Sequence, residues 1–286
     1  MIIDSHTHTF PERIAAGTIE TLSGNAHIKP ALEATVGALA SSMERAGIDL
    51  SINLPVATSA RQVPKLNDSA AAINEAAAEA AGGPKVISFG CMHPDYEDWH
   101  EELSRAARMG LKGIKIHPPY QGVDIDDIRY LRIIDRAAQL GLTVITHAGL
   151  DVGLPGVDRC RPSMCRNVIE QIGEFPFILA HMGGWRCWEE VPEQLAGTGV
   201  YLDTSFSEGS LDAFPDGYWT GDGLLMLGEE EFLGLIRTFG ADQILFGTDS
   251  PWADQKKCLD RVRALPLTEE EKEKILGGNA KKLLGV

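Results

Sequence analysis

The sequence predicts an α/β protein that folds as a (β/α)8 TIM barrel, a single domain over residues 1–286. Short apolar segments with strand character alternate eight times with helical segments, which indicates parallel strands with helices outside them. Eight such units close a barrel, and a chain of 286 residues has the usual length. The rival architecture is an open doubly wound sheet, whose first strand usually precedes a glycine-rich phosphate turn. Here the first strand ends instead in His6-Thr7-His8.

The strand segments are short, apolar and bounded by glycine, proline or polar turn residues. They are residues 2–8, 48–54, 86–92, 113–117, 142–147, 177–181, 200–203 and 243–247. The helical segments carry apolar residues at helical spacing, and several end at a glycine. They are residues 30–46, 67–81, 96–109, 126–140, 163–172, 188–195, 229–239, 254–265 and 268–284. Residues 9–29 contain prolines and glycines, and we expect them to form a polar connection.

Composition excludes several classes of function. The formal charge is −15 and no cluster of Lys and Arg stands out, which disfavours binding to nucleic acids or anionic membranes. No apolar run is long enough to span a bilayer. The first residues contain no basic region followed by an apolar core, so we expect no signal peptide. The five cysteines are scattered without a Cys-x-x-Cys pair, as is typical of reduced thiols. We therefore expect a soluble cytoplasmic protein that acts on a small molecule, and a homo-oligomer is compatible with the sequence.

The histidines are distributed unevenly along the chain. Two of the eight, His27 and His100, lie away from strand ends. The other six stand at or just after the C-terminal end of a predicted strand, and they are His6, His8, His93, His117, His147 and His181. Those strand ends meet on one rim of a barrel, where such enzymes build their active sites. Because side chains alternate along a strand, His6 and His8 point the same way and form half of a metal site.

Asp249 follows the last predicted strand and supplies a carboxylate. In a closed barrel the last strand pairs with the first, so Asp249 would lie beside His6 and His8. Two or three imidazoles with one carboxylate and an open position form a catalytic divalent site. The alternative for Asp249 is a helix N-cap. For His147 and His181 the alternative is a core histidine that is bonded to a backbone carbonyl.

These motifs resemble the amidohydrolase superfamily of metal-dependent barrel hydrolases. The chain is most similar to the branch that includes aminocarboxymuconate-semialdehyde decarboxylase and related uncharacterised hydrolases. The matching segments span the whole chain in the family's order. They are Asp4-Ser5-His6-Thr7-His8, Gly113-Ile114-Lys115-Ile116-His117-Pro118, Thr146-His147-Ala148-Gly149, Ala180-His181-Met182-Gly183-Gly184, Phe246-Gly247-Thr248-Asp249-Ser250-Pro251-Trp252 and Asn279-Ala280 with Leu283-Leu284.

The resemblance implies a set of roles. His6, His8, His147 and Asp249 would hold one divalent ion, zinc above all, with manganese as the alternative. His181 would stand in the outer shell near the bound water or substrate. Asp249 would also accept a proton from that water. The chemistry agrees, because zinc lowers the pKa of its water to about 7 and a carboxylate can then take the proton.

Other residues have more than one interpretation. Lys115 shares the inner face with His117; in other branches of the superfamily a lysine on this strand is carboxylated and bridges two metals. The alternative is a buried lysine that is paired with a carboxylate. In the rim loops, Arg159, Trp185 and Trp252 suit recognition of a small planar or carboxylated substrate. Ordinary loop packing or a subunit interface would explain them equally well.

The leading functional hypothesis is a metal-dependent hydrolase of an amide, a lactone or another ester. Nonoxidative decarboxylation of a small carboxylic acid with the same metal site is the alternative. A TatD-type deoxyribonuclease is disfavoured by the acidic charge and because that group typically has a glutamate where Lys115 and His117 stand. A barrel that only binds a partner would not need the ligand set to be complete.

Overall fold

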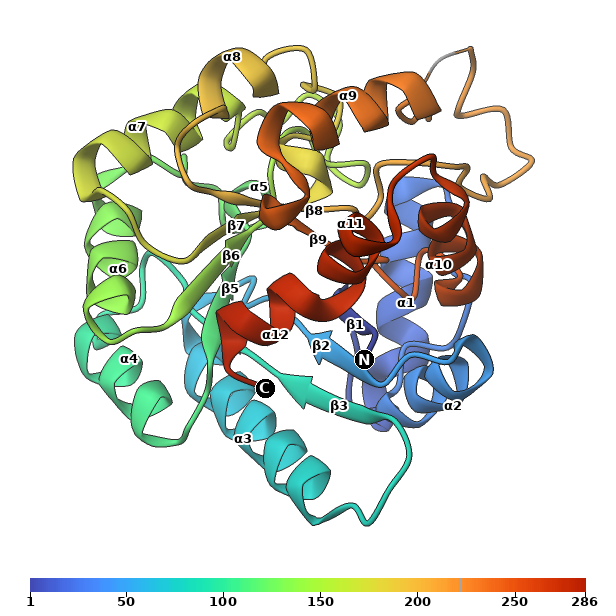
Figure 1. Ribbon diagram of the computed structural model, residues 1–286. Helices are drawn as coiled ribbons and strands as arrows, with labels where there is room; N and C mark the ends of the chain where they lie inside the picture. Colours follow the sequence, from blue (N-terminus) through green and yellow to red (C-terminus); the bar gives the residue numbers. More distant parts are fainter. Residues whose placement is uncertain (222) are drawn as a thin grey trace.

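The computed structural model describes residues 1–221 and 223–286 and shows short parallel strands surrounded by helices (Figure 1). The strands are β1 (Ile3–Thr7), β2 (Leu50–Asn53), β3 (Lys85–Ser88), β4 (Gly90–Cys91), β5 (Gly113–Ile116), β6 (Thr143–Thr146), β7 (Phe177–Leu179), β8 (Tyr201–Asp203) and β9 (Ile244–Leu245). The α-helices are α1 (Glu12–Ala26), α2 (Val36–Ala46), α3 (Val63–Glu79), α4 (Trp99–Arg108), α5 (Pro118–Gln121), α6 (Ile128–Gln139), α7 (Pro162–Ile172), α8 (Val191–Leu195), α9 (Glu229–Phe239), α10 (Gln255–Ala264), α11 (Glu269–Glu273) and α12 (Asn279–Leu284). Shorter helical turns are η1 (Ala60–Gln62), η2 (His181–Gly183), η3 (Ala241–Gln243) and the π-helical η4 (Lys274–Gly278).

The strands follow the chain order around the barrel. Within the described residues, β1, β2 and β3 pair in sequence, as do β4 to β9, and each of these pairings is parallel. A single residue, Phe89, separates β3 from β4, so the two form one interrupted strand. Backbone N–H groups of Ser5 and His8 donate to the carbonyls of Phe246 and Ser250, at 2.8 and 2.7 Å. These bonds join β1 to the segment that follows β9.

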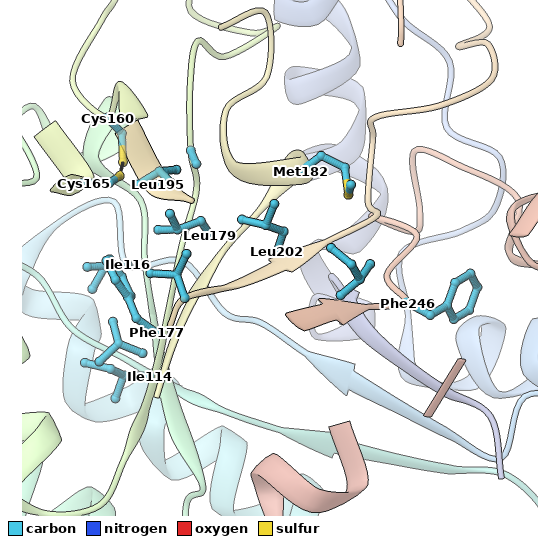
Figure 2. Packing of buried hydrophobic residues seen from close by; sticks show 14 of the residues in the cluster. Ile114, Ile116, Cys160, Cys165, Phe177, Leu179, Met182, Leu195, Leu202 and Phe246 are labelled. Carbon is cyan, nitrogen blue, oxygen red and sulfur yellow. Dashed lines mark hydrogen bonds between the residues drawn. The ribbon is translucent and has the colours of Figure 1, made fainter. Parts of the chain in front are cut away.

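Side chains alternate between the barrel interior and the layer under the helices. On β5, Ile114 and Ile116 pack outward in a large cluster with residues of the helices, whereas Lys115 lies inside the barrel. Figure 2 shows residues of this outer cluster, which come from several strands and from the surrounding segments. The inner cluster consists of Ile3, Leu50, Ile52, Leu54, Phe89, Ile145, Ile178, Leu245, Ala280 and Leu284.

The last helix contributes to the inner cluster. Ala280 and Leu284 belong to α12, which lies across the barrel near the N-terminus in Figure 1. A Cβ added to Gly277, just before α12, would come within 2.3 Å of the carbonyl oxygen of Met1. The absence of a side chain at this position therefore allows the C-terminal segment to approach the start of β1 closely. The rim loops lie at the opposite end of the barrel, where the strands have their C-terminal ends.

The predicted (β/α)8 fold is confirmed, but two segments differ from the expectation. The prediction that residues 9–29 form a polar connection was wrong, because this segment contains α1. Three of the buried residues of α1, Ala15, Ile19 and Ser23, recur at helical spacing. The glycines of this segment obscured that pattern, and Gly17 lies on the face that lines a cavity. The helix predicted for residues 268–284 is divided into α11, η4 and α12.

Several helix boundaries also moved by a few residues. The helix predicted from Pro30 begins at Val36, because the Thr35 side chain accepts a hydrogen bond from the backbone N–H of Ala38 and caps it there. The helix predicted for residues 188–195 is limited to α8. In the described residues, no helix combines the length and the apolar character that a membrane span requires.

Candidate active site

A cavity of about 1050 Å³ opens at the C-terminal ends of the strands. The histidines that line it stand at or just after the ends of β1, β5, β6 and β7, and they are His6, His8, His117, His147 and His181. His93 is not among the described residues that line it, and its Nδ1 lies 3.2 Å from the backbone nitrogen of Asp95. Five of the six rim histidines thus meet at one cavity.

The first and last strands bring His6, His8 and Asp249 together. The Nε2 atoms of His6 and His8 are 3.2 Å apart. Asp249 Oδ1 lies 3.5 Å from His6 Nε2 and 3.1 Å from His8 Nε2. The φ angle of Asp249 is 61°, a left-handed conformation that is uncommon outside glycine, and its N–H donates to the His6 carbonyl at 2.8 Å. This bond to β1 holds the carboxylate beside the two imidazoles.

Asp203, the last residue of β8, orients His6. Its Oδ2 lies 2.8 Å from His6 Nδ1, and its Oδ1 accepts the backbone N–H groups of His181 and Ser205 at 3.1 and 3.0 Å. Burial alone would raise the pKa of Asp203, but the contact with His6 outweighs it and the pKa falls to about 2. Burial also lowers the pKa of His6 to about 4, so the imidazole is neutral at pH 7. Because the carboxylate can only accept, His6 donates from Nδ1 and its Nε2 keeps a lone pair.

Three more histidines are oriented by backbone carbonyls. His8 Nδ1 lies 2.7 Å from the carbonyl oxygen of Leu54, His147 Nε2 lies 2.9 Å from that of Leu150, and His181 Nδ1 lies 3.0 Å from that of Ser205. A carbonyl oxygen only accepts, so each of these nitrogens carries its ring's proton. The opposite nitrogens then carry lone pairs, and those of His147 and His181 lie 3.1 Å apart. Burial lowers the pKa of both rings, which keeps them neutral.

This arrangement fits a divalent metal ion. Two pairs of ring nitrogens, His6 with His8 and His147 with His181, face each other at 3.2 and 3.1 Å with their protons on the far side. Facing lone pairs repel each other unless a cation lies nearby. The chain supplies one cation, because Lys115 Nζ lies 3.4 Å from His6 Nε2. Imidazole nitrogens with one carboxylate are the ligands that zinc and its neighbours prefer.

The candidate ligand atoms form two groups, and within each group the atoms lie within 4.8 Å of one another. The first group contains His6, His181 and Asp249, and the second contains His117, His147 and Asp151. His181, which was expected in an outer shell, therefore shares a group with Asp249. His147 belongs to the second group and connects it to the first, because its Nδ1 lies 3.1 Å from His181 Nε2.

Asp151 was missed by sequence reasoning. Its Oδ2 lies 3.5 Å from His117 Nε2 and 3.9 Å from His147 Nδ1, and the two imidazole rings are stacked with centroids 4.4 Å apart. Burial raises the pKa of Asp151 to about 7. The residue lies in an irregular loop four positions after His147, so no periodicity marked it. Asp203 was also missed, although its place at a strand end is the signal that marked the histidines.

Lys115 lies inside the barrel, as the strand alternation predicted. Its side chain is 1% exposed, and burial lowers its pKa to about 8. Its Nζ lies 3.4 Å from His6 Nε2. The carboxylates that favour its charged form are Asp203, Asp249 and Asp151. Lys115 therefore contributes positive charge at the inner end of the cavity.

The rim loops supply aromatic residues to the cavity, but not the expected arginine. Trp185 and Trp252 line it. Arg159 is absent from the described residues that line it, and its guanidinium is paired with Asp124 at 2.8 Å. Other cations occupy the outer part of the cavity, and they are Arg13, Arg61 and Lys65.

A family model described as amidohydrolase matches residues 3–286, nearly the whole chain. The chain belongs to the amidohydrolase family. This confirms the resemblance that the motifs suggested, and it identifies the protein as an enzyme. Among the curated proteins, no match to this amidohydrolase was found.

Solved structures similar to this amidohydrolase include an uncharacterised TIM-barrel protein from Bordetella bronchiseptica, with a TM-score of 0.72 and 18% identity over 99% of this chain and 98% of that one. A 5-carboxyvanillate decarboxylase from Novosphingobium aromaticivorans, with bound manganese, has a TM-score of 0.69 and 15% identity, over 100% and 97% of the two chains. A protein assigned as a 2-pyrone-4,6-dicarboxylic acid hydrolase from Pseudomonas putida has a TM-score of 0.65 and 16% identity, over 99% and 97%. At these identities the comparisons show the barrel fold alone.

Proposed function

We propose that this amidohydrolase uses one divalent ion, zinc or manganese, to hydrolyse a small amide, lactone or other ester. The observation that carries the proposal is the set of imidazole nitrogens that face one another at the cavity beside Asp249. His6, His8, His147 and Asp249 would hold the ion, with His181 next to them. When bound, such an ion supplies Lewis-acid chemistry, because it lowers the pKa of a water and polarises a carbonyl oxygen.

Asp249 is the group that would accept the proton of the attacking water. Burial alone would raise its pKa, but the adjacent His6 and His8 imidazoles hold the pKa well below its usual range. The carboxylate is therefore ionised across the working pH range and is available as an acceptor. Proton transfer to a positioned side chain is worth typically about 10²–10⁴-fold in rate.

His181 would work beside Asp249. Because its Nδ1–H is donated to the Ser205 carbonyl at 3.0 Å, Nε2 can accept a proton on the cavity side. Once protonated there, the ring donates a hydrogen bond to a substrate oxygen or to a leaving group. Asp203 keeps His6 in the tautomer that turns its lone pair inward, which makes Asp203 a positioning residue.

A second candidate is nonoxidative decarboxylation of a small carboxylic acid. Lys115 favours it, because its ammonium group lies beside His6 and could hold a substrate carboxylate near the candidate metal ligands. The similar manganese-containing structure is that of a decarboxylase, which makes this reaction worth testing.

The test is an activity screen of zinc-loaded and manganese-loaded protein. Lactones, aryl esters and anilides report hydrolysis by acid or chromophore release, and hydroxybenzoate-type acids report decarboxylation by release of CO2. We expect metal-dependent release from a lactone or ester, and we expect a chelator to abolish it. Release of CO2 without hydrolysis of any ester, lactone or amide would replace the hydrolase assignment with the decarboxylase.

A further inference from the structure

The cavity extends outward from the histidines between α1 and the helical segment formed by η1 and α3. We call this outer part the α1–α3 groove. It is lined by Ile14, Thr18 and Leu22 on one side and by Arg61, Lys65 and Ser69 on the other. The lining residues recur every three to four positions, so one face of each helix is turned to the groove.

The α1 wall of the groove is largely apolar. Ile14 and Leu22 contribute aliphatic side chains, and Ile14 is 41% exposed although it is a large apolar residue. The residues that anchor α1 to the barrel, Ala15 and Ile19, lie on a different face of the helix. The exposed apolar face of α1 is therefore turned to a space that continues into the candidate active site.

The opposite wall is basic. Arg61 in η1 and Lys65 in α3 are exposed and four positions apart, and the backbone is helical through Gln62 and Val63 between them. Two like charges at this spacing repel each other. Arg13 adds a third cation to the lining from the first turn of α1.

The cations of the groove lie outside the ion pairs that the described residues form. Among residues 1–221 and 223–286, no ion pair is found for Arg13, Arg61 or Lys65. The nearby Asp68 is instead paired with Arg105. The carboxylates that line the cavity, Asp151 and Asp249, lie at the histidine clusters. In a chain with a formal charge of −15, the outer groove is thus a local positive patch.

We propose that the α1–α3 groove binds the far end of an extended substrate, an apolar chain that ends in a carboxylate. The proposal rests on the proposed function, since the near end would carry the carbonyl group that reacts beside Asp249. The chain would pack on Ile14 and Leu22, and the terminal carboxylate would lie against Arg61 and Lys65. Charge complementarity and the continuity of the groove with the candidate active site select this occupant.

The substrate class is therefore a half-ester or half-amide of a straight-chain dicarboxylic acid. Such a molecule matches both ends of the cavity, because one acyl group is reactive and the other is a permanent anion at neutral pH. The apolar spacer accounts for Ile14 and Leu22 on the α1 wall, where the polar groups of the described lining are small hydroxyl groups and, in the first turn, Arg13.

The experiment compares chromogenic p-nitrophenyl half-esters of glutarate, adipate and suberate with matching p-nitrophenyl esters in which a methyl group replaces the terminal carboxylate. We expect a lower KM for the carboxylate-ended series. Arg61→Gln and Lys65→Gln should each raise the ratio of charged-ester KM to neutral-ester KM about threefold, and the double variant about tenfold, as exposed ion pairs do. Arg45→Gln is the matched control, because Arg45 is an exposed arginine on α2 outside the described lining, and it should leave that ratio unchanged.

Equal KM values for the two series in the parent enzyme, or a KM ratio that is unchanged in the double variant, would overturn the proposal. If neither series is hydrolysed, the proposed function has failed, and calorimetry with adipate alone then decides the groove. Adipate binding that weakens with salt and in the double variant supports the groove, whereas no binding overturns it. A change of oligomeric state in the double variant, measured by sedimentation, would identify the groove as an interface between copies and would also overturn the proposal.

Discussion

Replacement of Asp203 by asparagine tests how the site is held together. The carboxylate is fully buried and accepts from His6 Nδ1 on one oxygen and from backbone N–H groups on the other. An asparagine side chain has one acceptor oxygen and an NH2 group, so it cannot accept on both sides. If the asparagine oxygen accepts from His6, the backbone N–H groups of His181 and Ser205 lose their acceptor. If the oxygen accepts from the backbone, the NH2 group faces His6 Nδ1, and the ring's proton must move to Nε2, whose lone pair would bind the metal.

Two magnitudes follow from this change. A buried carboxyl whose pKa falls from 3.8 to about 2 contributes about 2 kcal/mol of stability at neutral pH. That contribution is present above the unfolded pKa of about 4 and is lost as the pH falls toward 2, because the folded pKa is the lower one. In addition, loss of a carboxylate that orients a metal-binding histidine typically costs about 10–100-fold in metal affinity.

The assay pairs urea unfolding of the metal-free protein with metal titration against a chromogenic chelator. We expect Asp203→Asn to be less stable by about 2 kcal/mol at pH 7, and we expect this difference to shrink between pH 4 and pH 2. Asp212→Asn is the control, since Asp212 is exposed and is paired with the partly exposed Lys29 at the surface. Parent-like stability together with parent-like metal affinity in Asp203→Asn would refute the reasoning.

Three further predictions concern the chemistry, the backbone and the place of the ligand. Asp249→Asn at matched metal occupancy should lower kcat about 10²–10⁴-fold, and His181→Asn should lower it less; near-normal turnover by Asp249→Asn would exclude it as the base. Gly149→Ala should lower the free energy of unfolding, measured in urea, by at least about 2 kcal/mol, because its Cβ would lie 2.3 Å from the backbone of Trp185 at a φ of +85°. Gly156→Ala is the control: its φ is +79° but its Cβ would meet open space, so it should lower the free energy of unfolding less. A product-soaked crystal should show density beside Trp185 at the rim, and density confined to the opposite end of the barrel would contradict the assignment.

The sequence predicted the features that depend on strand order and alternation. The rim position of His6, His8 and Asp249 follows from a closed barrel in which the last strand joins the first, and the structure brings the three together. The inward direction of Lys115 follows from the alternation of side chains on β5 in the same way. Such relations are local or topological, so residue order is sufficient to predict them.

Other features depend on loop conformation and side-chain rotamers, which residue order does not specify. Asp151 reaches His117 through an irregular loop, and the pairing of His147 with His181 depends on the ring orientations. Arg159 was a reasonable substrate-binding candidate, but Asp124 from a distant segment pairs with it. The cations that do line the cavity stand on η1, on α3 and on α1, and α1 was itself predicted to be a polar connection.

Elemental analysis of the purified protein tests the central claim most directly. The imidazole nitrogens that face the cavity beside an ionised Asp249 predict close to one zinc-like ion per chain. His8→Asn should lower that content, because His8 Nε2 faces both His6 and Asp249. Two tightly held ions per chain would instead indicate a second ion, held at His117, His147 and Asp151 or bridged by a carboxylated Lys115. Protein that holds no metal, even after reconstitution with zinc or manganese, would contradict the account of the site.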